Sequence, residues 1–229
     1  MWANRSPVGY WRWCLNVSPA GAEWARTTPS EEMMSPRLAL NSLVASRLVG
    51  RTGHVMSFEP TSTSFRILEQ NIALNGLVNV SASRLALSHT TGTTWLYHGV
   101  EPGSNSLGKS SAHGQGEVVS TECLDNVLVQ SSVNRVDVIK MDVEGAEELV
   151  LGGAKKALTK FKPIIIYEVA PERTAALRLS PRGAWDFLDQ LGYQFFVIGP
   201  NGEFTGQKSL PVNRNVVALH GKEDGRLDA

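Results

Sequence analysis

The feature that most constrains the fold is a continuous apolar run at residues 163–169, which reads PIIIYEV. A strand with one face in water alternates apolar and polar side chains, whereas a strand buried on both faces is apolar almost throughout. Sheets covered on both faces are mostly parallel and flanked by helices. The run therefore predicts an α/β fold in which strands alternate with helices.

Strand and helix patterns do alternate from residue 38 onward. We expect helices at 38–49, from Ser62 or Thr63 to Asn75, at 146–158 and at 183–191, with a helical turn at 123–129. We expect strands at 54–58, 78–87, 93–98, 117–121, 136–141, 163–169, 193–198 and 215–219. This order favours a doubly wound parallel sheet with right-handed crossovers. The last two strands have no helix between them, which suggests an antiparallel pair at one edge.

The first 37 residues have a different character. They contain four of the six tryptophans and four prolines, without helical or strand period. Because prolines interrupt regular elements, we expect an irregular or disordered segment at 1–37, one domain at 38–220 and a tail at 221–229. The first 22 residues hold two arginines and no acidic residue, which could be read as a weak organelle transit peptide, but we favour an unstructured start.

Composition excludes several classes of function. Lys plus Arg and Asp plus Glu number 22 each, so the net charge indicates neither nucleic acid nor an anionic membrane as a partner. No apolar run approaches the roughly 20 residues of a membrane helix. Cys14 and Cys123 fit neither a metal site nor a disulfide framework, and two free thiols suit a cytoplasmic location.

Carboxylates lie at or near the ends of three of the expected strands. Glu59 and Pro60 come after the strand at 54–58, Asp142 and Glu144 after the strand at 136–141, and Glu168 lies within the apolar run. In open α/β sheets, ligands bind beyond the carboxyl ends of the strands. These side chains are therefore candidates for a ligand or catalytic site at one edge of the sheet.

Each candidate also has a structural explanation. Glu59 could accept ribose hydroxyls or stabilise the dipole of the following helix, and its position alone does not decide between these roles. Asp142 and Glu144 could cap a helix, although acids beside Gly145 exceed what a cap needs. Lys140 is the nearest partner in sequence for these carboxylates and could serve only to pair with them.

A second motif points to another function. Residues 103–110 match the pattern of a phosphate-binding P-loop, in which Lys109 would reach the outer phosphates. A P-loop requires a helix directly after the lysine, but two glycines follow within residues 111–116. We therefore expect a flexible Gly/Ser loop here and retain nucleotide binding as a lesser alternative.

The run at 138–147, VIKMDVEGAE, resembles the signature of the FkbM family of S-adenosylmethionine-dependent methyltransferases. Segments 57–60, 68–76, 85–88, 121–128 and 163–168 resemble further parts of the family in the same order. The resemblance covers about residues 41–219 and implies a class I methyltransferase fold of seven strands with the last pair antiparallel. It also implies S-adenosylmethionine as cofactor and a hydroxyl oxygen of a small molecule or glycan as methyl acceptor.

The resemblance implies roles for the same carboxylates. Glu59 and Pro60 would contact the cofactor, with Glu59 on its ribose. Asp142 would lie near both the cofactor and the methyl-transfer centre, and Glu144 and Glu168 would line the same cleft. The general base stays open among Asp142, Glu144 and Glu168.

The sequence departs from the family at the cofactor loop. Counting back from Ser42, the stretch that should hold a Gly-Ala-Asn loop is 33–41, which has no glycine and contains Pro36. We therefore expect the first central strand and its loop to be missing or replaced, as an altered reading frame or gene start would cause. Reading the upstream DNA in three frames tests this. A non-catalytic remnant or interaction module of the same fold is the alternative.

Overall fold

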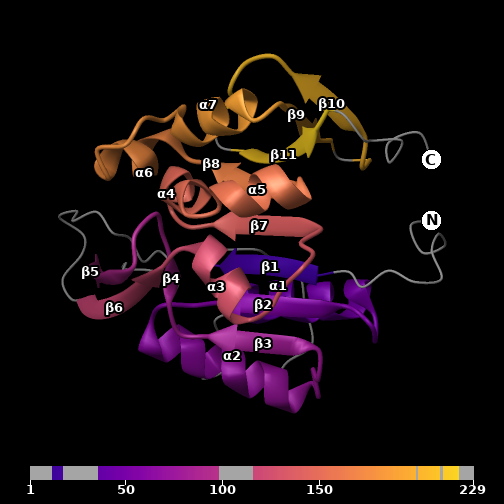
Figure 1. Cartoon of the computed structure of the whole chain (residues 1–229), viewed down its shortest axis with the longest axis vertical. Coiled ribbons are helices and arrows are strands. Elements are labelled where there is room, and N and C mark those ends of the chain that lie inside the picture. Colours follow the sequence, from indigo (N-terminus) through magenta and orange to yellow (C-terminus); the bar gives the residue numbers. More distant parts are fainter. Residues whose placement is uncertain (1–11, 18–35, 98–115, 200, 212–213, 222–229) are drawn as a thin grey trace.

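A computed structural model of the chain describes residues 12–17, 36–97, 116–199, 201–211 and 214–221. Its main sheet has eight strands in the order β10-β9-β11-β8-β7-β1-β2-β3, and a separate three-stranded sheet has the order β4-β6-β5 (Figure 1). Helices alternate with the parallel strands. The expected doubly wound α/β fold is confirmed.

The strands are β1 (Arg12–Val17), β2 (His54–Phe58), β3 (Val80–Ser83), β4 (Ala86–Leu87), β5 (Gly92–Tyr97), β6 (Gly116–Glu122), β7 (Val138–Asp142), β8 (Ile164–Val169), β9 (Tyr193–Ile198), β10 (Phe204–Gln207) and β11 (Arg214–His220). The helices are α1 (Pro36–Val49), α2 (Ser62–Leu74), α3 (Leu124–Gln130), α4 (Glu147–Gly152), α5 (Lys155–Phe161), α6 (Pro171–Ala176) and α7 (Gly183–Gln190).

The expectation that no strand precedes residue 38 is wrong. β1 lies at the centre of the sheet, parallel to β2 on one side and to β7 on the other. Asn16 is paired with Phe58 of β2 and with Met141 of β7. The sheet therefore has no central gap, and Arg12–Val17 belongs to the domain that the sequence placed at 38–220.

β1 escapes the sequence patterns because its sequence, RWCLNV, begins with a charged residue and has a polar residue near its end. Nothing local distinguishes it from the irregular sequence around it. Its strand conformation is stabilised by the ladders to β2 and β7, which are contacts distant in sequence.

The expected position of the cofactor loop is also wrong, because the central strand β1 ends at Val17, well before residues 33–41. Residues 36–41 lie in α1, with Pro36 as its first residue, where a proline is favourable because the first helical N–H needs no partner. The segment after β1 is 18–35, and it lies outside the described residues. Its sequence holds one glycine, Gly21.

The C-terminal strands form an antiparallel group at one edge, as expected. β11 lies between β8 and β9 and is antiparallel to both. The loop at 199–202 does not lead directly to β11, because β10 intervenes and pairs with β9 as a hairpin. This additional strand gives eight strands in place of the seven that the family resemblance implies.

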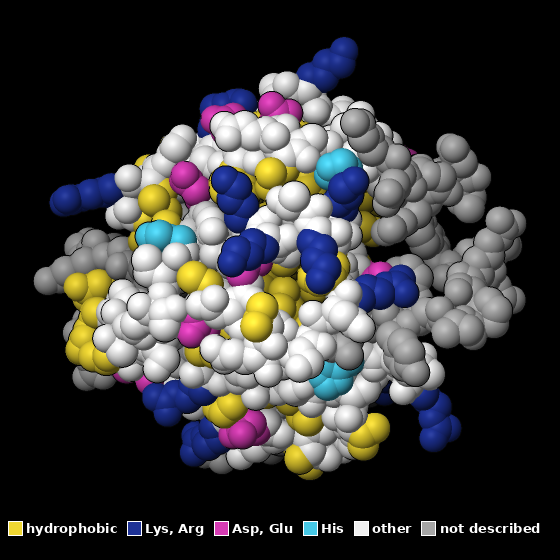
Figure 2. Space-filling model, in the orientation of Figure 1, with side chains coloured by type: hydrophobic (Ala, Val, Ile, Leu, Met, Phe, Trp, Pro, Cys, Tyr) yellow, Lys and Arg dark blue, Asp and Glu magenta, His cyan; other side chains and the backbone are white. Residues whose placement is uncertain are grey.

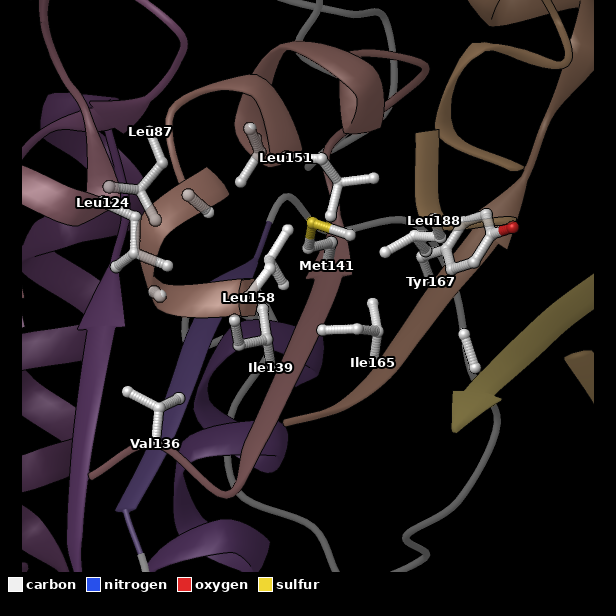
Figure 3. Close-up of a cluster of buried hydrophobic side chains, with 14 of the residues drawn as sticks. Leu87, Leu124, Val136, Ile139, Met141, Leu151, Leu158, Ile165, Tyr167 and Leu188 are labelled. Carbon is white, nitrogen blue, oxygen red and sulfur yellow. The ribbon is translucent and has the colours of Figure 1, made fainter. Parts of the chain in front are cut away.

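Two apolar clusters pack on the main sheet, on opposite faces of β2. The larger joins β7 and β8 to the helices α3, α4, α5 and α7, through side chains that include Ile139, Met141, Leu158, Ile165 and Leu188 (Figure 3). The smaller joins α1 and α2 to β2, through Ala45, Val49, Val55 and Leu68. One face of β8 is buried in the larger cluster, whereas Ile164, Ile166 and Glu168 on its other face are only partly buried, so the burial of the run at 163–169 is less complete than its sequence predicts.

Three further expectations needed correction. The helix expected at 146–158 is two helices, α4 and α5, which meet where Gly153 packs directly on the backbone of Ser88. The helix α6 was not expected at all. The N-cap of α2 is Thr61, not Ser62 or Thr63.

Candidate active site

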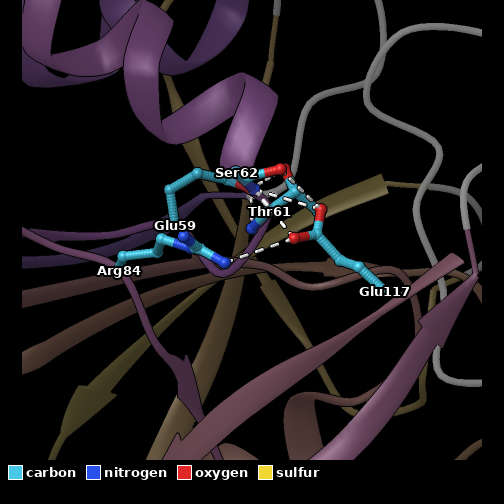
Figure 4. Close-up of polar contacts among 5 residues, drawn as sticks. All are labelled: Glu59, Thr61, Ser62, Arg84 and Glu117. Atoms are coloured by element: carbon cyan, nitrogen blue, oxygen red, sulfur yellow. Dashed lines mark hydrogen bonds and ion pairs between the residues drawn. The ribbon is translucent and has the colours of Figure 1, made fainter.

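Glu59 lies in the turn between β2 and α2 and is only 1% exposed. One of its carboxylate oxygens, Oε1, accepts hydrogen bonds from Thr61 N at 2.9 Å and Thr61 Oγ1 at 2.5 Å (Figure 4). The other oxygen, Oε2, is buried and has no hydrogen-bond partner within the part of the chain that the structure describes. Because a buried acceptor without a donor is costly, Oε2 is a place where a ligand hydroxyl would be stabilised.

The small sheet is attached to the main sheet beside Glu59. Glu117 of β6 accepts hydrogen bonds from Ser62 N at 3.1 and 3.2 Å and lies 3.5 Å from the guanidinium of Arg84 (Figure 4). A carboxylate at the start of α2 satisfies a helix N–H and complements the helix dipole. Sequence patterns did not indicate this contact, because 55 residues separate Glu117 from Ser62.

Asp142 ends β7, and the turn from it to α4 contains Glu144 and Gly145. Lys140 Nζ lies 3.7 Å from Asp142 Oδ2, so the expected pairing with this lysine is present. Glu144 is 3% exposed and has a φ of 56°. A non-glycine residue in the left-handed region is uncommon and is typical of sites where surrounding contacts hold the backbone.

Arg173 of α6 joins two of the candidate carboxylates. Its guanidinium forms an ion pair with Glu144 Oε2 and lies 3.6 Å from Glu168 Oε2. Burial raises the pKa of Glu144 to about 8, although Arg173 opposes this rise. The sequence patterns missed Arg173 because they did not predict α6. Arg173 follows the strand at 163–169 by four residues, so the sequence beyond that strand contained a local signal for it.

Glu147 and Tyr167 lie behind these carboxylates. Glu147 is 4% exposed, and its carboxylate accepts long hydrogen bonds from Val143 N and Gly145 N, at 3.3 and 3.4 Å. The Tyr167 hydroxyl is buried and has no partner among the described residues. Both side chains line a small cavity that also touches Gly145 and Glu168.

The structure thus brings Asp142, Glu144 and Glu168 together at the carboxyl ends of β7 and β8. Glu59 lies across β1 from Asp142, because β1 pairs with both neighbouring strands at this level. Two strand spacings are about 10 Å. Glu59 and Asp142 therefore flank the carboxyl end of the central strand, and Pro60 lies in the turn directly after Glu59.

Three buried carboxyls make the stability of the fold depend on pH. Burial raises the pKa of Glu59 and Glu147 to about 7 and that of Glu144 to about 8. The unfolded chain releases these protons near pH 4.5, whereas the native protein keeps them until pH 7–8. The free energy of unfolding is therefore highest below pH 4.5 for these groups and falls as pH rises through 7–8.

We expect the free energy of unfolding to fall by at least about 2 kcal/mol between pH 5.5 and pH 8.5, since one pKa unit corresponds to about 1.4 kcal/mol. Urea unfolding at several pH values measures this. Glu69→Gln, on the exposed surface of α2, should leave the slope unchanged, whereas Glu59→Gln should reduce it. A stability that rises over this interval would contradict the burial of these groups.

Replacing Tyr167 with Phe tests whether the buried hydroxyl has a partner. Without one, Tyr167→Phe removes an unsatisfied polar group, and we expect stability to be unchanged or to rise by up to about 1 kcal/mol. A loss of about 1 kcal/mol or more would instead indicate a water in the cavity that bridges the hydroxyl to another group. Thermal unfolding of the two proteins distinguishes these results.

Other expected features fall outside this site. The P-loop-like stretch at 103–110 lies outside the described residues. The described residues contain no group of three or more metal-ligating side chains and no helix long and apolar enough to cross a membrane. On the face shown in Figure 2, the described Lys and Arg side chains are interspersed with Asp and Glu side chains.

A model of the methyltransferase FkbM domain matches residues 34–195. The chain belongs to the FkbM methyltransferase family. The matched region contains every carboxylate of the candidate site and extends from α1 into β9. None of the curated protein sequences matches the chain.

A solved FkbM methyltransferase shares the fold of this FkbM-family chain. Methyltransferase FkbM from Methylobacillus flagellatus is 13% identical, with a TM-score of 0.50 over 80% of this chain. This chain spans only 41% of that protein's length. Precorrin-6y C5,15-methyltransferase from Geobacter metallireducens is 8% identical, with a TM-score of 0.43 over 93% of this chain and 82% of the other. SMU.1697c from Streptococcus mutans, in complex with SAH, is 7% identical, with a TM-score of 0.45 over 90% of this chain and 86% of the other.

Proposed function

We propose that this protein transfers a methyl group from S-adenosylmethionine to a hydroxyl oxygen of a small molecule or glycan. Membership of the FkbM family supports methyl transfer. The observation that carries the proposal is the placement of Glu59 and Asp142 on either side of the carboxyl end of β1. In open α/β sheets this edge is where ligands bind.

The residues at this edge fit the cofactor. Glu59 Oε2 is a buried acceptor without a donor among the described residues, and a ribose hydroxyl would supply the donor. Pro60 restricts the backbone of the turn that carries Glu59. When bound, S-adenosylmethionine would supply a methyl group on a positively charged sulfur, which is electrophilic.

The carboxylates on the other side of β1 would handle the acceptor. A carboxylate within hydrogen-bond distance of the acceptor hydroxyl would take its proton while the oxygen attacks. We assign this role to Asp142, because it lies on the strand next to β1, whereas Glu168 lies one strand further away. Glu144 is bound to Arg173 and would orient that arginine and the turn.

Titration calorimetry with S-adenosylmethionine and with S-adenosylhomocysteine tests the proposal. We expect binding of both, accompanied by a rise in melting temperature. A folded protein that gives no heat and no thermal shift at millimolar ligand would overturn the proposal and support the non-catalytic alternative. A positive result leads to a screen of polyhydroxylated small molecules and oligosaccharides for gain of one methyl group by mass spectrometry.

A further inference from the structure

The turn that links β7 to α4 has an unusual backbone. Glu144 has a φ of 56° and Gly145, directly after it, a φ of 96°. Two successive left-handed residues, one of them not a glycine, persist only where neighbouring groups hold them. Asp142 immediately precedes this turn and Glu144 is part of it, so the turn determines where both carboxylates lie.

One side of the turn is held by α6. A side chain at Gly145 would lie 2.5 Å from Thr174 N and 2.6 Å from Arg173 C, which is closer than van der Waals contact allows. Gly145 therefore lets the backbone of the turn pack directly on the backbone of α6. Arg173, on the same helix, reaches Glu144.

The other side of the turn is held by Glu147. Its carboxylate accepts from Val143 N and Gly145 N, the residues that precede and follow Glu144. Glu147 begins α4, where an acidic side chain also complements the helix dipole. That role requires no burial, yet Glu147 is 4% exposed and has lost its hydration. Burial against the turn indicates a function of the carboxylate in holding the backbone.

We propose that Glu147 is a positioning residue, whose buried carboxylate holds the turn through Val143 N and Gly145 N and so places Asp142 and Glu144 at the reaction edge. The importance of that placement rests on the proposed methyl transfer. The charged or titratable groups around the carboxylate include Asp142 on β7, Glu144 in the turn and Tyr167 on β8. Glu148 on α4 and Glu168 on β8 line the same cavity as Glu147.

Amide exchange and NMR test this inference without any ligand. In Glu147→Ala we expect the amides of Val143 and Gly145 to exchange roughly tenfold faster than in the wild type, with core amides such as Ile139 unchanged. Glu147→Gln keeps an oxygen acceptor and should restore most of the protection. Glu148→Ala is the matched control, because Glu148 packs against Gly183 of α7 and should leave both amides protected.

A pH titration supplies the second readout. The amide shifts of Val143 and Gly145 should follow a midpoint near pH 7 in the wild type, lose it in Glu147→Gln and keep it in Glu144→Gln. Persistence of the midpoint in Glu147→Gln, or unchanged exchange in Glu147→Ala, would overturn the inference. Because neither readout uses cofactor or acceptor, these results are independent of whether S-adenosylmethionine binds.

Discussion

Replacing Glu59 with Gln is expected to weaken binding of S-adenosylhomocysteine by roughly 10- to 100-fold, because a hydrogen bond to a charged group contributes about 1.5–3 kcal/mol. The amide keeps an oxygen for Thr61 but puts an NH₂ group where Oε2 would accept a ribose hydroxyl. Titration calorimetry measures the change in dissociation constant directly and requires no acceptor.

The pH dependence of this binding gives an independent check. Burial raises the pKa of Glu59 to about 7, so the carboxyl is largely protonated at pH 6 and ionised at pH 8. A ribose hydroxyl that donates to Oε2 favours the ionised form, so wild-type affinity should rise between these pH values. Glu59→Gln should lose this rise, and Glu69→Gln should retain it. Equal affinity in wild type and Glu59→Gln would refute the ribose assignment.

Replacing Arg173 with Met is expected to lower the free energy of unfolding by about 2–3 kcal/mol at pH 9. The substitution leaves the Glu144 carboxylate, which is 3% exposed, without its cationic partner. The guanidinium itself is 42% exposed, so the loss should fall below that of a fully buried pair. At pH 6 the loss should be clearly smaller, because Glu144, with a pKa of about 8, then carries a proton.

Two comparisons make this result specific. Arg182→Met removes an ion pair to Asp186 in which both side chains are about half exposed, and should cost no more than about 0.5 kcal/mol. Glu144→Gln in the Arg173→Met background should recover most of the loss at pH 9, since no buried charge remains. Urea unfolding at pH 9 measures the free energy of unfolding of the wild type, of Arg173→Met, of Arg182→Met and of the double variant. Equal losses in Arg173→Met and Arg182→Met would show that Glu144 does not depend on Arg173.

Much of the fold could be predicted because its signals are local. The strand at 54–58 has the bounds that the sequence predicts, and the apolar run at 163–169 differs from β8 by one residue. Apolar side chains at helical spacing located α7 within one residue as well. These elements bury side chains that follow a period, and a period is visible in the sequence.

Some residues of the candidate site could likewise be predicted from local signals, and others could not. Glu59, Asp142, Glu144 and Glu168 could be found because each lies at or near the end of a recognisable strand. Glu117 could not, since it reaches the site from β6, 55 residues away in sequence from its partner Ser62. Arg173 follows a predicted strand closely, but its contact with Glu144 is made from α6, which the sequence patterns did not predict. Their contacts depend on how helices and strands pack, which local patterns do not contain.

The sequence by itself determined the doubly wound sheet, the edge at which the carboxylates gather and the family to which the chain belongs. Tertiary structure alone decided that Arg12–Val17 is the central strand, because its conformation depends on ladders to β2 and β7. The tertiary structure also decided how deeply the carboxylates are buried and which groups they contact. Burial, which no single residue encodes, leaves Glu59 with an unpartnered oxygen among the described residues and places Glu144 beside Arg173.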